Sequence, residues 1–289
     1  MPFQWDKFEN TKLSARFIRL ILAAILVLSL YGTKLVNYFK PLFLPAQAQP
    51  LGQPRKRAMN SDDALQVLSQ IQKIIDETGA KVFLVSGTLL GFHRDGQIMK
   101  HDYDLDVGIF HDDPALDDFL DKISALPGLV KLGRKRLRLW DRLANEWIPK
   151  LRENVIIYKV DIAARPDAQK IRIDVFVHFP ARGKMVHGST RSLWTNSNFE
   201  LEKMAVSGLE FFVPKDRDLY LRENYGDYKK PVKNFESSVD CPNCVNIYSL
   251  DAVWFLVKTY LRLGNRGDND RAGLMHFRIA RFLRGYSRP

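Results

Sequence analysis

Three aspartates occupy every second position of one segment, at Asp102, Asp104 and Asp106. Residues two apart share one face of an extended strand. The pattern therefore crowds three like charges, which destabilises a fold unless a cation neutralises them. The residues that would face the core on the other side of the strand are apolar: Leu105, Val107 and Ile109. The segment predicts a metal site on a half-buried strand.

A glycine-bounded turn precedes these aspartates. Gly87 and Gly91 flank Thr88, and glycine allows a close approach of the backbone to a ligand. Backbone amides at the start of the following helix can hold a phosphate. Arg94 and Lys100 supply positive charge that suits phosphate. We therefore expect a phosphate-binding turn beside the metal site.

A further carboxylate is expected from a neighbouring strand. Asp174 interrupts a run of apolar and β-branched residues at 171–179, where an unpaired charge would be costly. It is either a third metal ligand with Asp104 and Asp106 or the partner of Arg172, which shares its face. Asp102 is either a further ligand or a residue that orients the neighbouring Lys100 and His101. Phosphoryl transfer requires carboxylate-bound divalent cations of this kind, and Mg²⁺ prefers a few carboxylates together with substrate oxygens.

The composition is that of a folded protein with an anionic partner. Hydrophobic residues make up 46% of the 289 residues and charged residues 27%, and the formal net charge is +11. This length can bury one core with a small appended subdomain. The positive charge favours a phosphate, a nucleotide or an acidic membrane surface. We expect no nucleic-acid partner, because no zinc-finger, helix-turn-helix or RNA-binding signature is present.

The N-terminal region contains an uncharged apolar run at 20–33, extended by further apolar residues on both sides. A membrane span needs about 20 apolar residues, and basic residues at both ends can reach the headgroups. We expect a single-pass membrane anchor. A cleaved signal peptide and a buried soluble helix are the alternatives. Basic residues on both sides leave the orientation undecided.

The rest of the chain divides by composition. We expect an N-terminal tail and anchor at 1–40, a linker at 41–60, a catalytic domain at 61–240 and a helical extension at 241–289. Mixed helices and strands predict an α+β fold with a small mixed sheet flanked by helices. Cys241 and Cys244 specify little alone, so a local disulfide, two thiols and half of a metal site all remain open.

Individual elements follow from periodicity and end signals. Expected helices cover 61–78, a short piece through Leu90, a segment starting at Asp113, and then 216–225, 249–263 and 272–283. Expected strands cover 81–85, 105–110, 156–162, 171–179 and 209–213. The arginine-rich face of the last helix is either solvated or a contact with an anionic membrane surface.

Four blocks of the chain, in this order, resemble the signature of the LicD/fukutin family of the polymerase-β-like nucleotidyltransferase superfamily. They are Gly87-Thr-Leu-Leu-Gly-Phe-His-Arg94, Asp102-Tyr-Asp-Leu-Asp-Val-Gly-Ile109, Ile173-Asp-Val-Phe176, and Leu209–Pro214 with Tyr220–Tyr228 and Pro231. Together the blocks cover roughly residues 80–232. Two positions depart from the usual pattern, Tyr103 and His93.

The resemblance implies a transferase that moves a phospho-alcohol, such as phosphocholine or ribitol phosphate, from a CDP-linked donor to a glycan hydroxyl with release of CMP. It implies Mg²⁺ or Mn²⁺ held by Asp104 and Asp106, with Asp174 in support. It also implies a substrate-binding set made of Gly87, Thr88, Arg94, Lys100 and Asp102. The alternatives are an Asp-x-Asp glycosyltransferase that uses a nucleotide-sugar and a membrane-anchored relative without catalytic activity.

Overall fold

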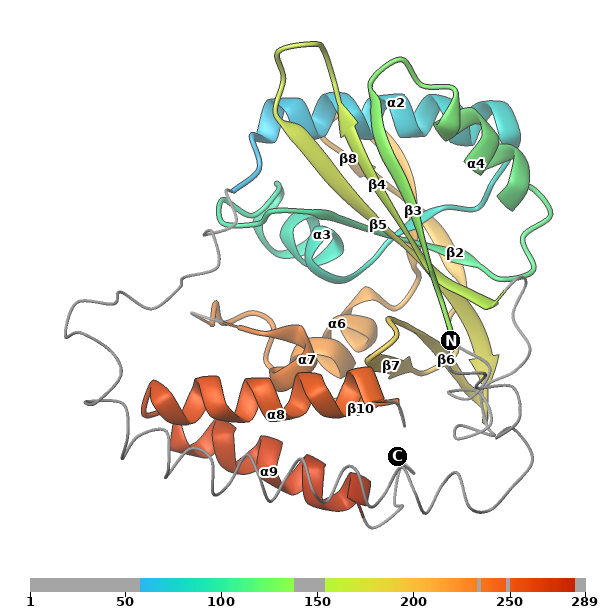
Figure 1. The fold of residues 1–289 in the computed structure, drawn as a ribbon. Coiled ribbons are helices and arrows are strands. Elements are labelled where there is room, and N and C mark those ends of the chain that lie inside the picture. The colour runs from blue at the N-terminus through green and yellow to red at the C-terminus, as the bar shows by residue number, and fades with distance from the viewer. Residues whose placement is uncertain (1–57, 138–153, 233–234, 248–249, 284–289) are drawn as a thin grey trace, which may run out of the picture. The chain divides into compact units, whose positions relative to one another are not determined.

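The computed structural model describes residues 58–137, 154–232, 235–247 and 250–283 (Figure 1). Within them, residues 58–137, 154–232 and 235–245 belong to one compact unit. A second unit contains residues 246–247 and 250–283. The two units are described separately below.

The first unit is built around a mixed sheet of ten strands. Eight of them follow the order β10-β7-β6-β5-β2-β1-β9-β8, while β4 pairs with β5 and β3 pairs with β4. The bounds are β1 Phe83–Leu84, β2 Leu105–Phe110, β3 Leu129–Arg136, β4 Val155–Ala163, β5 Lys170–Ala181, β6 Lys184–Gly188, β7 Ser192–Asn196, β8 Leu201–Val206, β9 Leu209–Pro214 and β10 Cys244–Asn246.

Strand β5 pairs with three other strands of this sheet. Its first part pairs in parallel with β2 and antiparallel with β4. Its last part, from Phe179, pairs antiparallel with β6 instead. Apolar side chains dominate both β2 and β5, as expected of strands covered on their two faces. The polar exceptions in these strands are therefore informative, and Asp106 and Asp174 are two of them.

Helix α2 (Ser61–Thr78) begins at Asn60, whose side chain accepts a hydrogen bond from the Asp63 amide. It ends at Gly79, which adopts the left-handed conformation that favours glycine. Its apolar face packs on α4 (Leu116–Ser124) and reaches β4, β5 and β9 (Figure 1). Helix α2 therefore supports β5, one of the strands that carry the acidic residues.

Of a second group of helices, α3 (Ser86–Leu90) contacts β2, and its Gly87 amide bonds the Asp106 side chain. Helix α3 leads directly into the π-helical turn η2 (Gly91–Asp95). Helix α6 (Arg217–Tyr225) contacts α3, β7 and β9, and the short α7 (Ser237–Asp240) follows. Ser86, the first residue of α3, has a positive φ of 48°, a strained conformation for a residue with a side chain.

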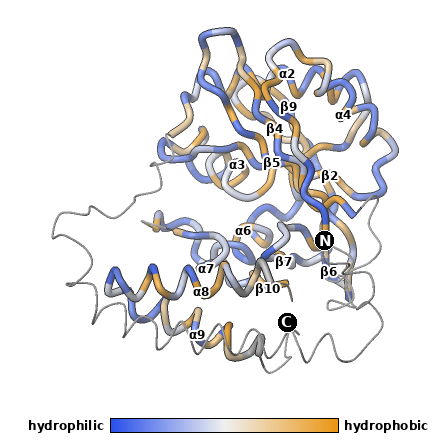
Figure 2. The backbone as a smooth tube through the Cα atoms, viewed as in Figure 1, coloured by the Kyte–Doolittle hydropathy of each residue, from blue (hydrophilic) through white to orange (hydrophobic). Residues whose placement is uncertain are grey.

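The second unit contains a helical hairpin, α8 (Leu250–Asn265) and α9 (Asn269–Leu283), whose helices pack on each other. Figure 2 shows hydrophobic and hydrophilic residues alternating along α8. Trp254 and Phe277 project into solvent, with 58% and 62% of their surface exposed. In the described part of the chain no helix is long and apolar enough to span a membrane. The expected anchor at 20–33 lies outside the described residues.

The α+β prediction is confirmed, but the prediction of a small sheet is wrong, since the sheet has ten strands. The unpredicted strands include β3 and β8, which are largely exposed and lack apolar alternation. The β6–β7 hairpin was also missed. Cys241 and Cys244 are buried thiols with no disulfide between them.

Candidate active site

Two carboxylates meet on neighbouring strands because of the pairing register. In the parallel pair β2–β5, Asp106 lies directly opposite Asp174. Burial, and then the negative charges of Asp104, Asp102 and Asp174, raise the pKa of Asp106 well above its ordinary value. Four acidic side chains therefore act on one another at one place on the sheet. The structure brings together the acidic residues that the sequence pattern singled out.

The prediction that Asp102, Asp104 and Asp106 all lie on one strand is wrong. Strand β2 begins only at Leu105, so Asp102 and Asp104 precede it. The Asp102 amide donates to the Met99 carbonyl at 3.0 Å, and the Asp102 carbonyl accepts from the Met59 amide at 2.7 Å. These bonds hold a turn where an extended strand was expected. The acidic cluster combines a turn with two strands.

The glycine turn holds the acidic cluster in place. The Gly87 amide donates to Asp106 Oδ2 at 3.1 Å, and the Asp106 amide donates to Thr88 Oγ1 at 2.7 Å. A Cβ at Gly87 would lie 3.0 Å from Asp102 Oδ2 and 3.4 Å from Asp106 Oδ2. Glycine is needed here to leave room for the carboxylates. The phosphate-binding role of Gly87 and Thr88 stays a prediction, because both groups bond Asp106 in this structure.

Two basic side chains neighbour these carboxylates on the same face. Lys159 of β4 lies directly opposite Asp174 of β5 and forms an ion pair with its Oδ2 atom. Arg172 bonds Asp161 twice, at 2.8 Å and 3.2 Å. The expected alternative of an Arg172–Asp174 pair is therefore wrong: Lys159 is the partner of Asp174. The register of β4 decides this, and a single sequence does not reveal it.

Tyr103 stands at the edge of the same cluster. Its side chain is partly exposed. Partial burial, followed by the charges of Asp104, Asp102, Asp106 and Asp174, raises the pKa of its hydroxyl to about 12. The neutral phenol remains a hydrogen-bond donor and acceptor at physiological pH. Tyr103 was noted in the sequence only as a departure from a family pattern.

The acidic cluster fits a divalent cation by its chemistry. Asp174 is buried, and its Oδ1 atom has no hydrogen-bond partner. Carboxylate oxygens are the ligands that Mg²⁺ and Mn²⁺ prefer, and a cation would relieve the repulsion around Asp106. Across the described ranges, no three His, Cys, Asp or Glu side chains are already arranged as a set of metal ligands. Metal binding by Asp104, Asp106 and Asp174 therefore stays a prediction.

Arg94 and Lys100 have different surroundings. The Arg94 guanidinium bonds both oxygens of Asp95, at 2.8 Å and 2.7 Å, and donates to the Tyr228 carbonyl at 3.2 Å. Lys100 is exposed near the turn that holds Asp102. Contacts of either residue with a substrate stay predictions. The Arg94 bond to Tyr228 connects η2 with the loop after α6.

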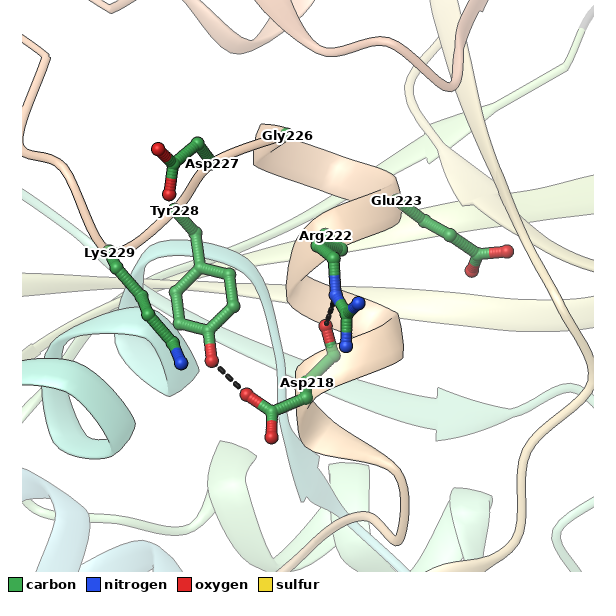
Figure 3. A pocket seen from close by; sticks show the side chains of 7 residues that line it. All are labelled: Asp218, Arg222, Glu223, Gly226, Asp227, Tyr228 and Lys229. Atoms are coloured by element: carbon green, nitrogen blue, oxygen red, sulfur yellow. Dashed lines mark hydrogen bonds between the residues drawn. The ribbon is translucent and has the colours of Figure 1, made fainter.

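That loop and α6 line a cavity of about 680 Å³. Figure 3 shows Tyr228 and Arg222 extending toward Asp218, with Lys229 beside Tyr228 and Glu223 directed away. The Tyr228 hydroxyl donates to Asp218 Oδ1 and lies 3.3 Å from His93 Nε2. The cavity therefore adjoins η2, which contains His93.

The lining of this cavity combines donors and acceptors without an excess of positive charge. Three carboxylates and two cations contribute: Asp218, Glu223, Asp227, Arg222 and Lys229. Because Glu223 is directed away, a phosphate would find no excess of positive charge there, whereas a neutral group with hydroxyls or amides would find both donors and acceptors. The prediction of substrate-binding residues did not include this cavity. The only sequence signal was the family block at 220–228.

Beyond the carboxylates, the same face of β2 and β5 is aromatic. His178 and His187 are fully buried and stacked, with ring centroids 4.3 Å apart. Phe83 meets His178 at 4.9 Å between centroids. Burial lowers the pKa of His178 to about 3 and that of His187 well below its ordinary value. Both rings are neutral at physiological pH and form a rigid apolar support for the site.

Comparisons with known proteins find similarity to one family. Residues 79–216 match the family described as LicD/FKTN/FKRP, nucleotidyltransferase domain. The chain is 26% identical over 189 residues to the Homo sapiens ribitol-5-phosphate transferase FKTN, and 25% identical over 189 residues to the Macaca fascicularis protein of the same name. Each match covers 62% of this chain but only 36% of the relative. The chain thus spans about a third of the length of these relatives.

Proposed function

We propose that this chain transfers a phospho-alcohol from a CDP-linked donor to a glycan hydroxyl, because residues 79–216 match the LicD/FKTN/FKRP nucleotidyltransferase family. The observation that supports this most strongly is the register that sets Asp106 against Asp174, with Asp104 and Asp102 close enough to raise the Asp106 pKa. Such a cluster suits a substrate that arrives with a cation.

The reaction is an in-line displacement at the phosphorus that bears the alcohol. The acceptor hydroxyl oxygen forms a new bond to this phosphorus, the bond to the bridging oxygen breaks, and CMP leaves with the bonding electron pair. A carboxylate of the cluster accepts the hydroxyl proton. Mg²⁺ or Mn²⁺ held by Asp104, Asp106 and Asp174 would neutralise the pyrophosphate charge.

The remaining residues position the substrates in this proposal. The bonds from Gly87 and to Thr88 fix the orientation of Asp106. We assign Arg94, Lys100 and the exposed edge of the glycine turn to the donor phosphates. The cavity lined by Arg222, Tyr228 and Lys229 suits the neutral, hydroxyl-bearing part of a substrate, because its charges nearly balance.

We also propose a membrane-anchored location through residues 20–33. The apolar run in the sequence supports this, and so does the formal net charge of +11, which favours an anionic surface.

The function is tested by offering the purified chain CDP-ribitol, CDP-choline and CDP-glycerol with a membrane glycan extract and Mg²⁺ or Mn²⁺. We expect CMP release from at least one donor, dependent on the metal and abolished by chelation. Release of UDP or GDP from nucleotide-sugars would support the alternative glycosyltransferase. Metal-dependent CDP binding without any product would support a relative that lacks catalytic activity.

A further inference from the structure

A transverse row of three charged residues crosses the sheet at the candidate site. Lys159 on β4 lies opposite Asp174 on β5, and Asp174 lies opposite Asp106 on β2. Directly paired residues project to the same face of a sheet. The Lys159 ammonium group is therefore aligned with the two carboxylates and ion-pairs with Asp174.

Asp174 needs positive charge whether or not a metal is bound. Its side chain is only 10% exposed, and its Oδ1 atom has no hydrogen-bond partner. Loss of the partner of a buried charge is strongly destabilising. Lys159 supplies that charge here from a side chain that is 36% exposed. A lysine on a flexible four-carbon stem can also leave its partner without a change in the backbone.

We propose that Lys159 is an exchangeable internal cation: it neutralises Asp174 until a divalent cation binds and then turns to the phosphates of the donor. The proposal rests on the metal-dependent function proposed above. Lys159 and the metal compete for the negative charge of the same carboxylate, so Lys159 weakens metal binding by the protein alone. Once displaced, its ammonium group lies beside the site where the donor pyrophosphate would bind.

Arg172 provides a matched comparison on the same face. It lies two residues from Asp174 on β5 and carries the same charge as Lys159. Its guanidinium group, however, is held by two hydrogen bonds to Asp161. Removing either cation changes the local electrostatic potential in the same direction. Only removal of Lys159 vacates an oxygen of Asp174.

The test measures Mn²⁺ binding to the full chain, stripped of metal, from the electron paramagnetic resonance signal of free Mn²⁺. We expect Lys159→Gln to bind Mn²⁺ about tenfold more tightly than the wild type, the size of an ordinary coupling between sites. Arg172→Gln should change the affinity less than threefold, and Lys159→Arg should stay close to the wild type. Circular dichroism confirms that each variant is folded.

A second measurement follows the other half of the exchange. With saturating Mn²⁺, we expect Lys159→Gln to bind CDP about fivefold more weakly by calorimetry, because a phosphate partner is missing. Tighter metal binding with weaker nucleotide binding is a combination that a purely structural ion pair does not produce.

Two results would overturn the exchange. One is unchanged or weaker Mn²⁺ binding by Lys159→Gln, and the other is an equal gain in both charge variants. The proposed metal site is tested separately by Asp174→Asn. If that variant binds Mn²⁺ as the wild type does, then Asp174 is not a ligand, and both the metal site and the exchange fail.

Discussion

At the scale of single residues, the negative charge of Asp106 that the proposed function needs lowers the stability of the folded chain. Burial and three neighbouring carboxylates raise its pKa, so the ionised side chain is disfavoured in the folded chain relative to the unfolded chain. We predict that Asp106→Asn, which can still accept the Gly87 amide, raises the urea midpoint at pH 7.5 in the presence of chelator. A lower urea midpoint for the variant would show that neighbouring carboxylates do not repel the charge of Asp106.

His178 gives a prediction about pH. Its pKa is about 3 in the folded chain, against about 6.5 when unfolded. The unfolded chain therefore binds more protons at acid pH, and stability is lost as the pH falls from 6.5 toward 3. Between pH 7 and pH 5 this loss is about 2 kcal/mol from His178 alone.

The matched variant for this prediction is His178→Asn, whose amide can replace the ring nitrogen 3.1 Å from the Phe176 carbonyl. We expect the urea-derived free energy of unfolding of the variant to fall by about 2 kcal/mol less than that of the wild type between pH 7 and pH 5. Equal falls would mean that His178 is not held neutral.

At the scale of elements, Gly108 of β2 shows how tightly the aromatic support packs. A Cβ there would lie 2.4 Å from Phe83 and 2.7 Å from His178. We predict that Gly108→Ala lowers the free energy of unfolding by about 1–3 kcal/mol, the usual cost of overpacking. Gly133→Ala in β3 is the control, since its nearest neighbour would be 3.7 Å away. Equal effects of the two substitutions would disprove this packing argument.

Elements with local signals were predictable from the sequence. The strand at 105–110 was confirmed at both ends, and so was the end of helix 61–78 at Gly79, although Asn60 and not Ser61 is the N-cap of this helix. The strands at 156–162 and 171–179 were confirmed to within two residues at each end. Strand β3 was not predicted, because an exposed edge strand needs no apolar alternation.

The acidic residues of the site could be proposed from their spacing and from the family resemblance. The side chains that pair with them could not be predicted. The partner of Asp174 depends on the register of β4, which follows from packing of the whole sheet. The cavity beside Tyr228 depends on the meeting of η2 and the loop after α6. Interactions between residues that are more than a hundred positions apart leave little signal in a single sequence.

At the scale of the whole molecule, the proposed anchor makes a simple prediction. The full chain should sediment with membranes and resist extraction by alkaline carbonate, because the apolar run at 20–33 would be buried in lipid. A chain restricted to residues 58–289 should remain in the supernatant. Recovery of the full chain in the supernatant would contradict the anchor.

The most direct test of the candidate site compares three isosteric substitutions in one assay, the metal-dependent transfer of labelled phospho-alcohol from the best CDP-linked donor to glycan. We predict that Asp106→Asn and Asp174→Asn each lower the rate at least about a hundredfold, as loss of a metal ligand does. Asp161→Asn, which alters a carboxylate of the same sheet bonded to Arg172, should retain at least about a third of the rate. Full transfer by the first two variants, or an equal loss in all three, would contradict a phosphoryl-transfer centre built on Asp106 and Asp174.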